Sequence, residues 1–143
     1  MIDAYLDRES RPGPYDRSTV QFLVGKKTKQ YSIGLEYTHE DRGEDPALEL
    51  ATMMAVIKLN GPWSLMGQAH WLLKPSVKGN DIAYIPFDPS AKATNLVAGL
   101  EYRVNKHVTL SPNVVWTHYS VNGSGERPAD DIHLRLTFYV NFE

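Results

Sequence analysis

The chain has 143 residues and a formal net charge of −2, with 15 basic and 17 acidic side chains. A chain of this length favours a single domain, and a charge this close to neutral argues against a nucleic-acid partner. The absence of cysteine excludes disulfides and thiolate metal sites. No run reaches the roughly 20 apolar residues of a transmembrane helix. A mean hydropathy of −0.38 still permits a membrane β-barrel, whose strands alternate apolar and polar residues.

Apolar and polar residues alternate with period two along most of the chain, which predicts strands. The expected strands cover residues 1–7, 18–24, 31–40, 48–59, 63–73, 94–104, 107–119 and 134–143. The stretch 48–59 differs from the others because it is apolar on both parities. Its place in the series favours a strand, and a buried helix is the competing interpretation.

The connections between these strands alternate between short and long. The short ones cover 25–29, 60–62 and 105–106, and the long ones, rich in Gly, Pro and charge, cover 10–17, 41–47, 74–92 and 122–131. This order predicts an antiparallel up-and-down meander with all short turns at one end. Within the longest loop, the apolar stretch 82–87 is expected either to constrict a barrel mouth or to lie against its rim.

Aromatic residues indicate which face of the strands meets lipid. On the apolar face, Tyr31, Trp63, Tyr102 and Phe142 are expected near the short turns, and Tyr37, Trp71 and Trp116 near the long loops. The eight steps from Trp63 to Trp71 span about 27 Å of strand. Once strand tilt is included, this spacing is close to the band of about 25 Å between the aromatic girdles of an outer-membrane barrel. We therefore expect a transmembrane β-barrel of about eight strands.

The polar face of the same strands is then expected to line a hydrated lumen. The candidate lumen-lining residues are Asp3, Asp7, Arg17, Glu36, Gln68, His70, Glu101, Arg103, His133 and Arg135. Both signs of charge occur among them, which permits pairing. Each charge is expected either to pair or to stay hydrated, because an isolated buried charge is costly.

The closing stretch "LRLTFYVNF" resembles the C-terminal strand of bacterial outer-membrane β-barrels, and "LEYRVNKHVTLSPNVVW" resembles a periplasmic hairpin of a porin. The resemblance implies a porin-like barrel in outer-membrane lipid, with short turns in the periplasm and long loops outside. It also implies that Leu136, Phe138, Val140 and Phe142 form the signal read by the barrel-assembly machinery. Glu143 departs from the family pattern, because the terminal aromatic is usually the last residue.

Three functions are compatible with these patterns. The first is passive transport of small polar solutes or ions by a porin-like channel. Such a channel can be a monomer or an oligomer. The second is a closed eight-stranded barrel with a structural or adhesive role and no open pore, since eight strands close around an interior filled by side chains. The third is a soluble lipocalin-like binding barrel.

The first candidate strand is shorter than the roughly nine to eleven residues of a spanning strand, and no signal sequence precedes it. We therefore expect residues 1–143 to be one barrel domain that is either the C-terminal part of a larger porin or a shortened version of one. The five histidines lack metal-ligand spacing, and no nucleophile elbow or phosphate-binding loop occurs. No catalytic, cofactor-binding or metal-binding residue is predicted.

Overall fold

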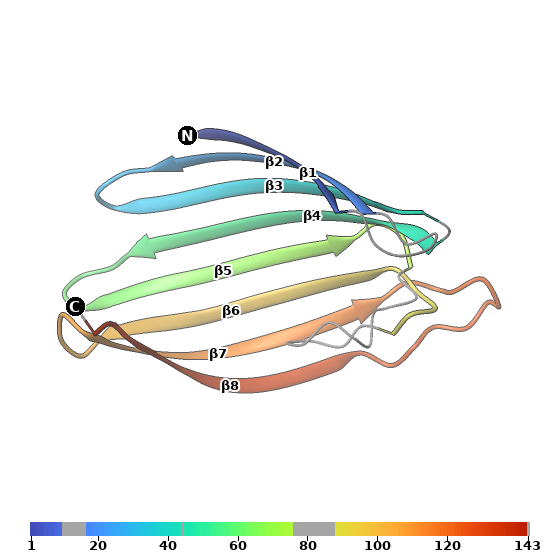
Figure 1. The fold of residues 1–143 in the computed structure, drawn as a ribbon. Coiled ribbons are helices and arrows are strands. Elements are labelled where there is room, and N and C mark those ends of the chain that lie inside the picture. Colours follow the sequence, from blue (N-terminus) through green and yellow to red (C-terminus); the bar gives the residue numbers. More distant parts are fainter. Residues whose placement is uncertain (10–16, 44, 76–87, 143) are drawn as a thin grey trace.

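The computed structural model of the protein describes residues 1–9, 17–43, 45–75 and 88–142 (Figure 1). These described residues contain eight strands. These are β1 (Ile2–Glu9), β2 (Arg17–Lys27), β3 (Tyr31–Arg42), β4 (Asp45–Lys58), β5 (Trp63–Leu72), β6 (Ala93–Arg103), β7 (Val108–Tyr119) and β8 (Asp131–Val140). Among the described residues, no helix is long and apolar enough to cross a membrane.

The strands form one antiparallel sheet in the order β1 to β8, each paired with its neighbour in the chain. The turns 28–30, 59–62 and 104–107 lie together at one end of the sheet, which we call the short-turn end (Figure 1). Both termini lie at this end, and the strand ends that the remaining connections join lie at the opposite end, which we call the long-loop end. The predicted all-β up-and-down meander of eight strands is therefore confirmed.

Two local expectations have different outcomes. The stretch 48–59 belongs to β4, so the strand interpretation is confirmed and the helix alternative is wrong. The long loop expected at 41–47 is wrong, because β3 and β4 continue almost to their turn and pair Arg42 with Asp45. A register shift between Glu40 and Arg42 places Pro46 at an irregularity, where a residue without an N–H is tolerated in a sheet. The stretch 82–87 lies outside the described residues.

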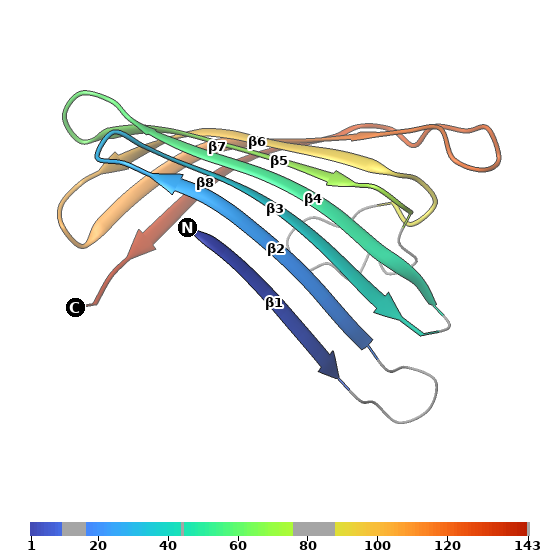
Figure 2. The same cartoon turned by 90° about the horizontal axis from the view of Figure 1, so that it is seen from above.

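The sheet is strongly curved, and it is open in the structure (Figure 2). Neighbouring strands pair from β1 through to β8, but within the described ranges no ladder joins β8 back to β1. Among the described residues, β1 and β8 therefore each have a neighbouring strand on one side only, the condition under which sheets add further strands.

The two faces of the sheet differ in chemistry because successive side chains of a strand point to opposite sides. The convex face carries large apolar side chains that are exposed, among them Phe22, Leu35, Leu65, Leu100, Val114, Leu134, Leu136 and Phe138. The concave face carries most of the polar and charged side chains of the strands, and it surrounds a cavity.

Candidate functional site on the concave face

The candidate lumen-lining residues all lie on the strand parity that faces the concave side. The register shows this directly, because Glu36, Thr52 and His70 are successive cross-strand partners on β3, β4 and β5. His70 in turn pairs with Asn95 on β6, which pairs with Thr117 on β7 and then with Asp131 on β8. We call this row the polar belt; its members are Glu36, Thr52, His70, Asn95, Thr117 and Asp131.

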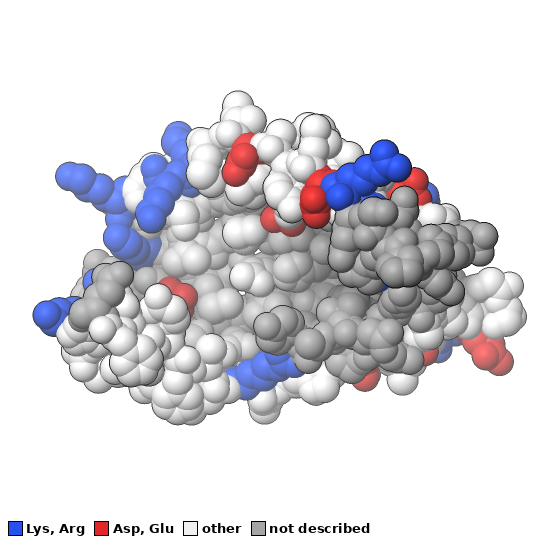
Figure 3. Space-filling view, in the orientation of Figure 1, with Lys and Arg blue, Asp and Glu red and all other residues white. Residues whose placement is uncertain are grey.

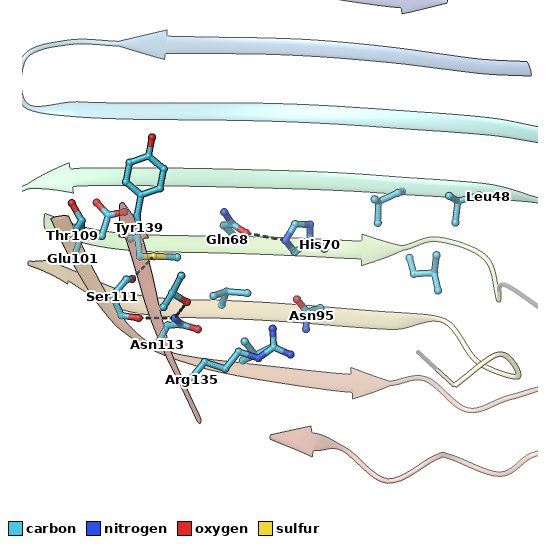
Figure 4. Close-up of a pocket in the computed structure, with 16 residues that line it drawn as sticks. Leu48, Gln68, His70, Asn95, Glu101, Thr109, Ser111, Asn113, Arg135 and Tyr139 are labelled. Carbon is cyan, nitrogen blue, oxygen red and sulfur yellow. Dashed lines mark hydrogen bonds between the residues drawn. The ribbon is translucent and has the colours of Figure 1, made fainter. Parts of the chain in front are cut away.

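A cavity of about 820 Å³ lies on this face, and 16 residues that line it are drawn in Figure 4. They come from β4 to β8 and share the concave parity. The cavity brings together four of the candidate residues, namely Gln68, His70, Glu101 and Arg135. It therefore places both signs of charge around one hollow in the sheet.

The other candidates do not line this cavity. Asp3, Asp7 and Arg17 lie on β1 and β2, and Arg17 is 3.6 Å from Oε1 of Glu40. Glu36 accepts hydrogen bonds from Gln21 (2.8 Å) and Thr38 (3.2 Å).

Arg103 and His133 are exposed. Figure 3 shows the hollow between the two ends of the molecule, with Lys and Arg gathered at the short-turn end and charges of both signs at the long-loop end.

Hydrogen bonds connect part of the polar belt to the cavity floor. Oγ1 of Thr52 lies 3.1 Å from Nδ1 of His70, and Nε2 of His70 lies 3.2 Å from Oε1 of Gln68. Both ring nitrogens of His70 are thus engaged with side chains of β4 and β5, which fixes the orientation of the imidazole in the cavity (Figure 4).

Asn95 is a buried polar residue of the cavity that is not among the residues predicted to line the lumen. Asn95 is 1% exposed, and its Nδ2 donates a 2.9 Å hydrogen bond to Oγ1 of Thr117, which is fully buried. Its other amide atom, Oδ1, is buried and has no hydrogen-bond partner among the described residues. Period two placed Asn95 on the polar parity, but its importance comes from neighbours on other strands, which alternation cannot reveal.

The concave face is not uniformly polar as expected, because an apolar rim borders the polar belt on the long-loop side. Leu50, Leu72, Ala93 and Tyr119 are successive cross-strand partners there. Leu72, Ala93 and Tyr119 are buried and form one cluster with Ala91, against which Leu48 packs. The hydroxyl of Tyr119 donates a 2.9 Å hydrogen bond to Oδ2 of Asp131, which joins the rim to the belt.

The predicted aromatic girdle residues within strands all lie on the convex parity. At the short-turn end, Trp63 and Tyr102 are direct partners with ring centroids 4.6 Å apart, and Tyr31 lies one outward-facing row away. At the long-loop end, Tyr37 and Trp71 share one row through Ala51.

Trp116 lies one row nearer the short turns, and its Nε1 donates a 3.0 Å hydrogen bond to Oδ2 of Asp130 in the adjoining loop.

The residues implied as an assembly signal are exposed on or just beyond the last strand. Leu136, Phe138 and Val140 lie on the convex parity of β8. Phe142 follows the end of β8 and is 94% exposed, so it makes little contact with the sheet.

The described residues contain no group of three or more His, Asp or Glu side chains that could hold a metal ion. The histidines at the long-loop end pair with single carboxylates instead. Nδ1 of His39 is 3.6 Å from Glu49, and Nδ1 of His118 is 3.1 Å from Asp130. The hydrogen bond with His118, assisted by the one from Trp116, lowers the pKa of Asp130 below its ordinary value.

Comparisons of the chain with protein-family models, with curated proteins and with solved structures found no match. The chemistry of the two faces of the sheet is therefore the basis on which a function is assigned.

Proposed function

We propose that the sheet is part of the wall of an outer-membrane β-barrel that passes small polar solutes or ions. In this proposal the convex face contacts lipid and the concave face lines a hydrated lumen. The observation that carries it is the exposure of large apolar side chains over the whole convex face, for example Leu134 at 85% and Phe138 at 63%.

Such a face is unfavourable in water. Burying one Leu or Phe side chain is worth about 1.5–3 kcal/mol, so a sheet that leaves many of them exposed requires an apolar surrounding. Exposed apolar patches of this kind mark protein or membrane contacts. Lipid is favoured over a protein partner because Trp and Tyr lie at two heights of the same face, at the levels where membrane interfaces select them.

The open edges support a barrel wider than these eight strands. Unpaired backbone groups cost several kcal/mol in lipid, so a spanning sheet has to close. Since β1 and β8 are not paired with each other among the described residues, we propose that further strands of the assembled protein complete the ring. An oligomer is one source of those strands. The last strand would serve the barrel-assembly machinery as its recognition signal.

The two alternatives receive less support. A closed eight-stranded barrel with a structural or adhesive role would need β1 to pair with β8. A soluble lipocalin-like barrel would turn its apolar parity inward, whereas Leu100 and Leu134 are exposed and Asn95 and Thr117 are buried.

Planar-bilayer recording on the reconstituted protein tests the proposal. We expect stable openings whose cation-to-anion selectivity falls in Glu101→Gln, because Glu101 lines the cavity. Leu100→Ile is the matched control. Leu100 is next to Glu101 in the chain, but its side chain lies on the convex face, so this substitution should leave the selectivity unchanged. Inserted protein that never opens would reject the channel and leave the closed structural barrel.

A further inference from the structure

The geometry points to a binding subsite around Asn95 for a small solute that joins a hydrogen-bond donor to an apolar body. The donor, an N–H or O–H group, would bind Oδ1 of Asn95, and the apolar body would lie against the side chains next to it in the cavity. This inference rests on the proposed function, because it assumes that solutes reach the concave face.

The need for a donor follows from the hydrogen bonds already formed around Asn95. Its Nδ2 is bound to Thr117, while Oδ1 is buried and has no hydrogen-bond partner in the part of the chain that the structure describes. His70 is the direct cross-strand partner of Asn95, but both of its ring nitrogens are engaged with Thr52 and Gln68. A buried acceptor that stays unpaired is costly, and native structures rarely leave one.

The apolar character of the solute follows from the side chains that flank Asn95. On β6 the next residues of the same face are Ala93 and Val97. Ala93 pairs with Leu72 and Tyr119, and Val97 pairs with Gln68 and Val115. Leu72, Val97 and Val115 line the cavity together with Asn95, and Gln68 is the one polar partner among them. A water molecule at this position would find few of the two to four polar partners that buried waters use. An apolar ring with one donor would fit better, because the donor would bind Oδ1 and the ring would contact the apolar side chains.

The size of the cavity agrees with a small-molecule site. Its volume of about 820 Å³ falls within the roughly 300–1,000 Å³ typical of ligand pockets, which are mostly apolar with a few convergent polar groups. Anionic solutes are disfavoured beside Leu50 and Leu72, because Arg135 is the one lysine or arginine among the described residues that line the cavity, and it lies on β8, away from β4 and β5.

Indole and 1-methylindole test the inference, since a methyl group replaces the N–H donor of indole in 1-methylindole. Binding to the detergent-solubilised, folded protein is measured by isothermal titration calorimetry. We expect indole to bind about fivefold more tightly than 1-methylindole, the ratio expected for one net hydrogen bond. In Asn95→Leu the preference should disappear while 1-methylindole still binds. Asn122→Leu is the matched control and should keep the preference, because Asn122 does not line the cavity and its Oδ1 already accepts hydrogen bonds from the backbone N–H groups of Ser124 and Glu126.

Equal affinities in the wild-type protein, no binding of indole, or a preference that persists in Asn95→Leu would overturn the inference. The wild-type comparison needs no substitution, so it decides the matter even if Asn95→Leu fails to fold. Channel openings without any donor preference would reject the subsite alone. Donor-dependent binding by a protein that never enters a bilayer would reject the channel alone.

Discussion

Trp63 and Tyr102 lie directly opposite each other on β5 and β6, with ring centroids 4.6 Å apart and ring planes inclined by 44°. The pair is on the convex face at the short-turn end, and both rings remain partly exposed. This arrangement lets the two rings contact each other and a membrane interface together, which is the position Trp and Tyr favour in membrane proteins.

Each ring should therefore contribute less to the stability of the folded protein when the other ring is removed. A double-mutant cycle with Trp63→Ala and Tyr102→Ala, measured by reversible unfolding in detergent or liposomes, should give a coupling free energy of about 0.5–1.5 kcal/mol. The neighbouring cross-strand pair Leu65 and Leu100 is the control and should give a smaller coupling. Additive effects of the two aromatic substitutions would show that the rings do not stabilise each other.

The stability of the loop between β7 and β8 should depend on pH through Asp130, whose carboxylate forms hydrogen bonds with His118 and Trp116. The hydrogen bond with His118 lowers the pKa of Asp130 in the folded protein below 3.8. The ionised Asp130 carboxylate therefore stabilises the folded protein fully at pH values above the pKa of the unfolded state, and this stabilisation is lost as the pH falls through the pKa of the folded state. We expect the NMR signal of the Trp116 indole N–H to shift in this acidic range.

Two variants test the assignment. In Asp130→Asn the acid-dependent shift should vanish, while Glu126→Gln, which changes another acid of the same loop, should retain it. A shift that persists in Asp130→Asn would assign the titration to a different group.

Gly99 should not tolerate a side chain, because β6 and β7 approach closely there. A Cβ atom at Gly99 would lie 2.7 Å from both the carbonyl oxygen of Pro112 and Cβ of Asn113. Gly99→Ala should lower the free energy of unfolding by about 1–3 kcal/mol, the cost of overpacking. Gly67→Ala is the control, since its Cβ would meet only Val97 O at 3.8 Å. Equal stability of the two variants in a denaturant titration would contradict the close approach.

Phe142 should matter for assembly in cells and not for the stability of the folded sheet. The residue follows β8 and is almost fully exposed, so Phe142→Ala should change the free energy of unfolding after refolding in detergent by less than about 0.5 kcal/mol. In cells the same variant should accumulate as uninserted protein. Normal insertion in cells would reject the role as an assembly signal.

Alternation of residues predicted the strands and their faces because side-chain direction in a strand has a period of two. The short turns at Asn60-Gly61 and Asn105-Lys106 were predicted from their short length and from residue types that favour turns. The strand β4 was harder to predict, since Leu50, Met54 and Val56 on the concave face make it apolar on both parities.

The polar belt and the apolar rim of the concave face could not be predicted in the same way. Whether Leu72 meets Ala93, or Asn95 meets Thr117, depends on the register between strands that are distant in sequence. The short loop after Arg42 was missed for a related reason. The sequence 41–47 has the composition of a loop, yet pairing across an irregular ladder continues through most of it.

The orientation of the two faces is the central claim, and labelling along β6 tests it most directly. The chain has no native cysteine, so single cysteines can carry a fluorophore without background. In liposomes, labels at Leu96, Ala98 and Leu100 should be quenched by brominated lipid, and labels at Val97 and Glu101 by aqueous iodide. Quenching in the opposite phase, or iodide access at every position, would contradict a lipid-facing convex side and the barrel proposed from it.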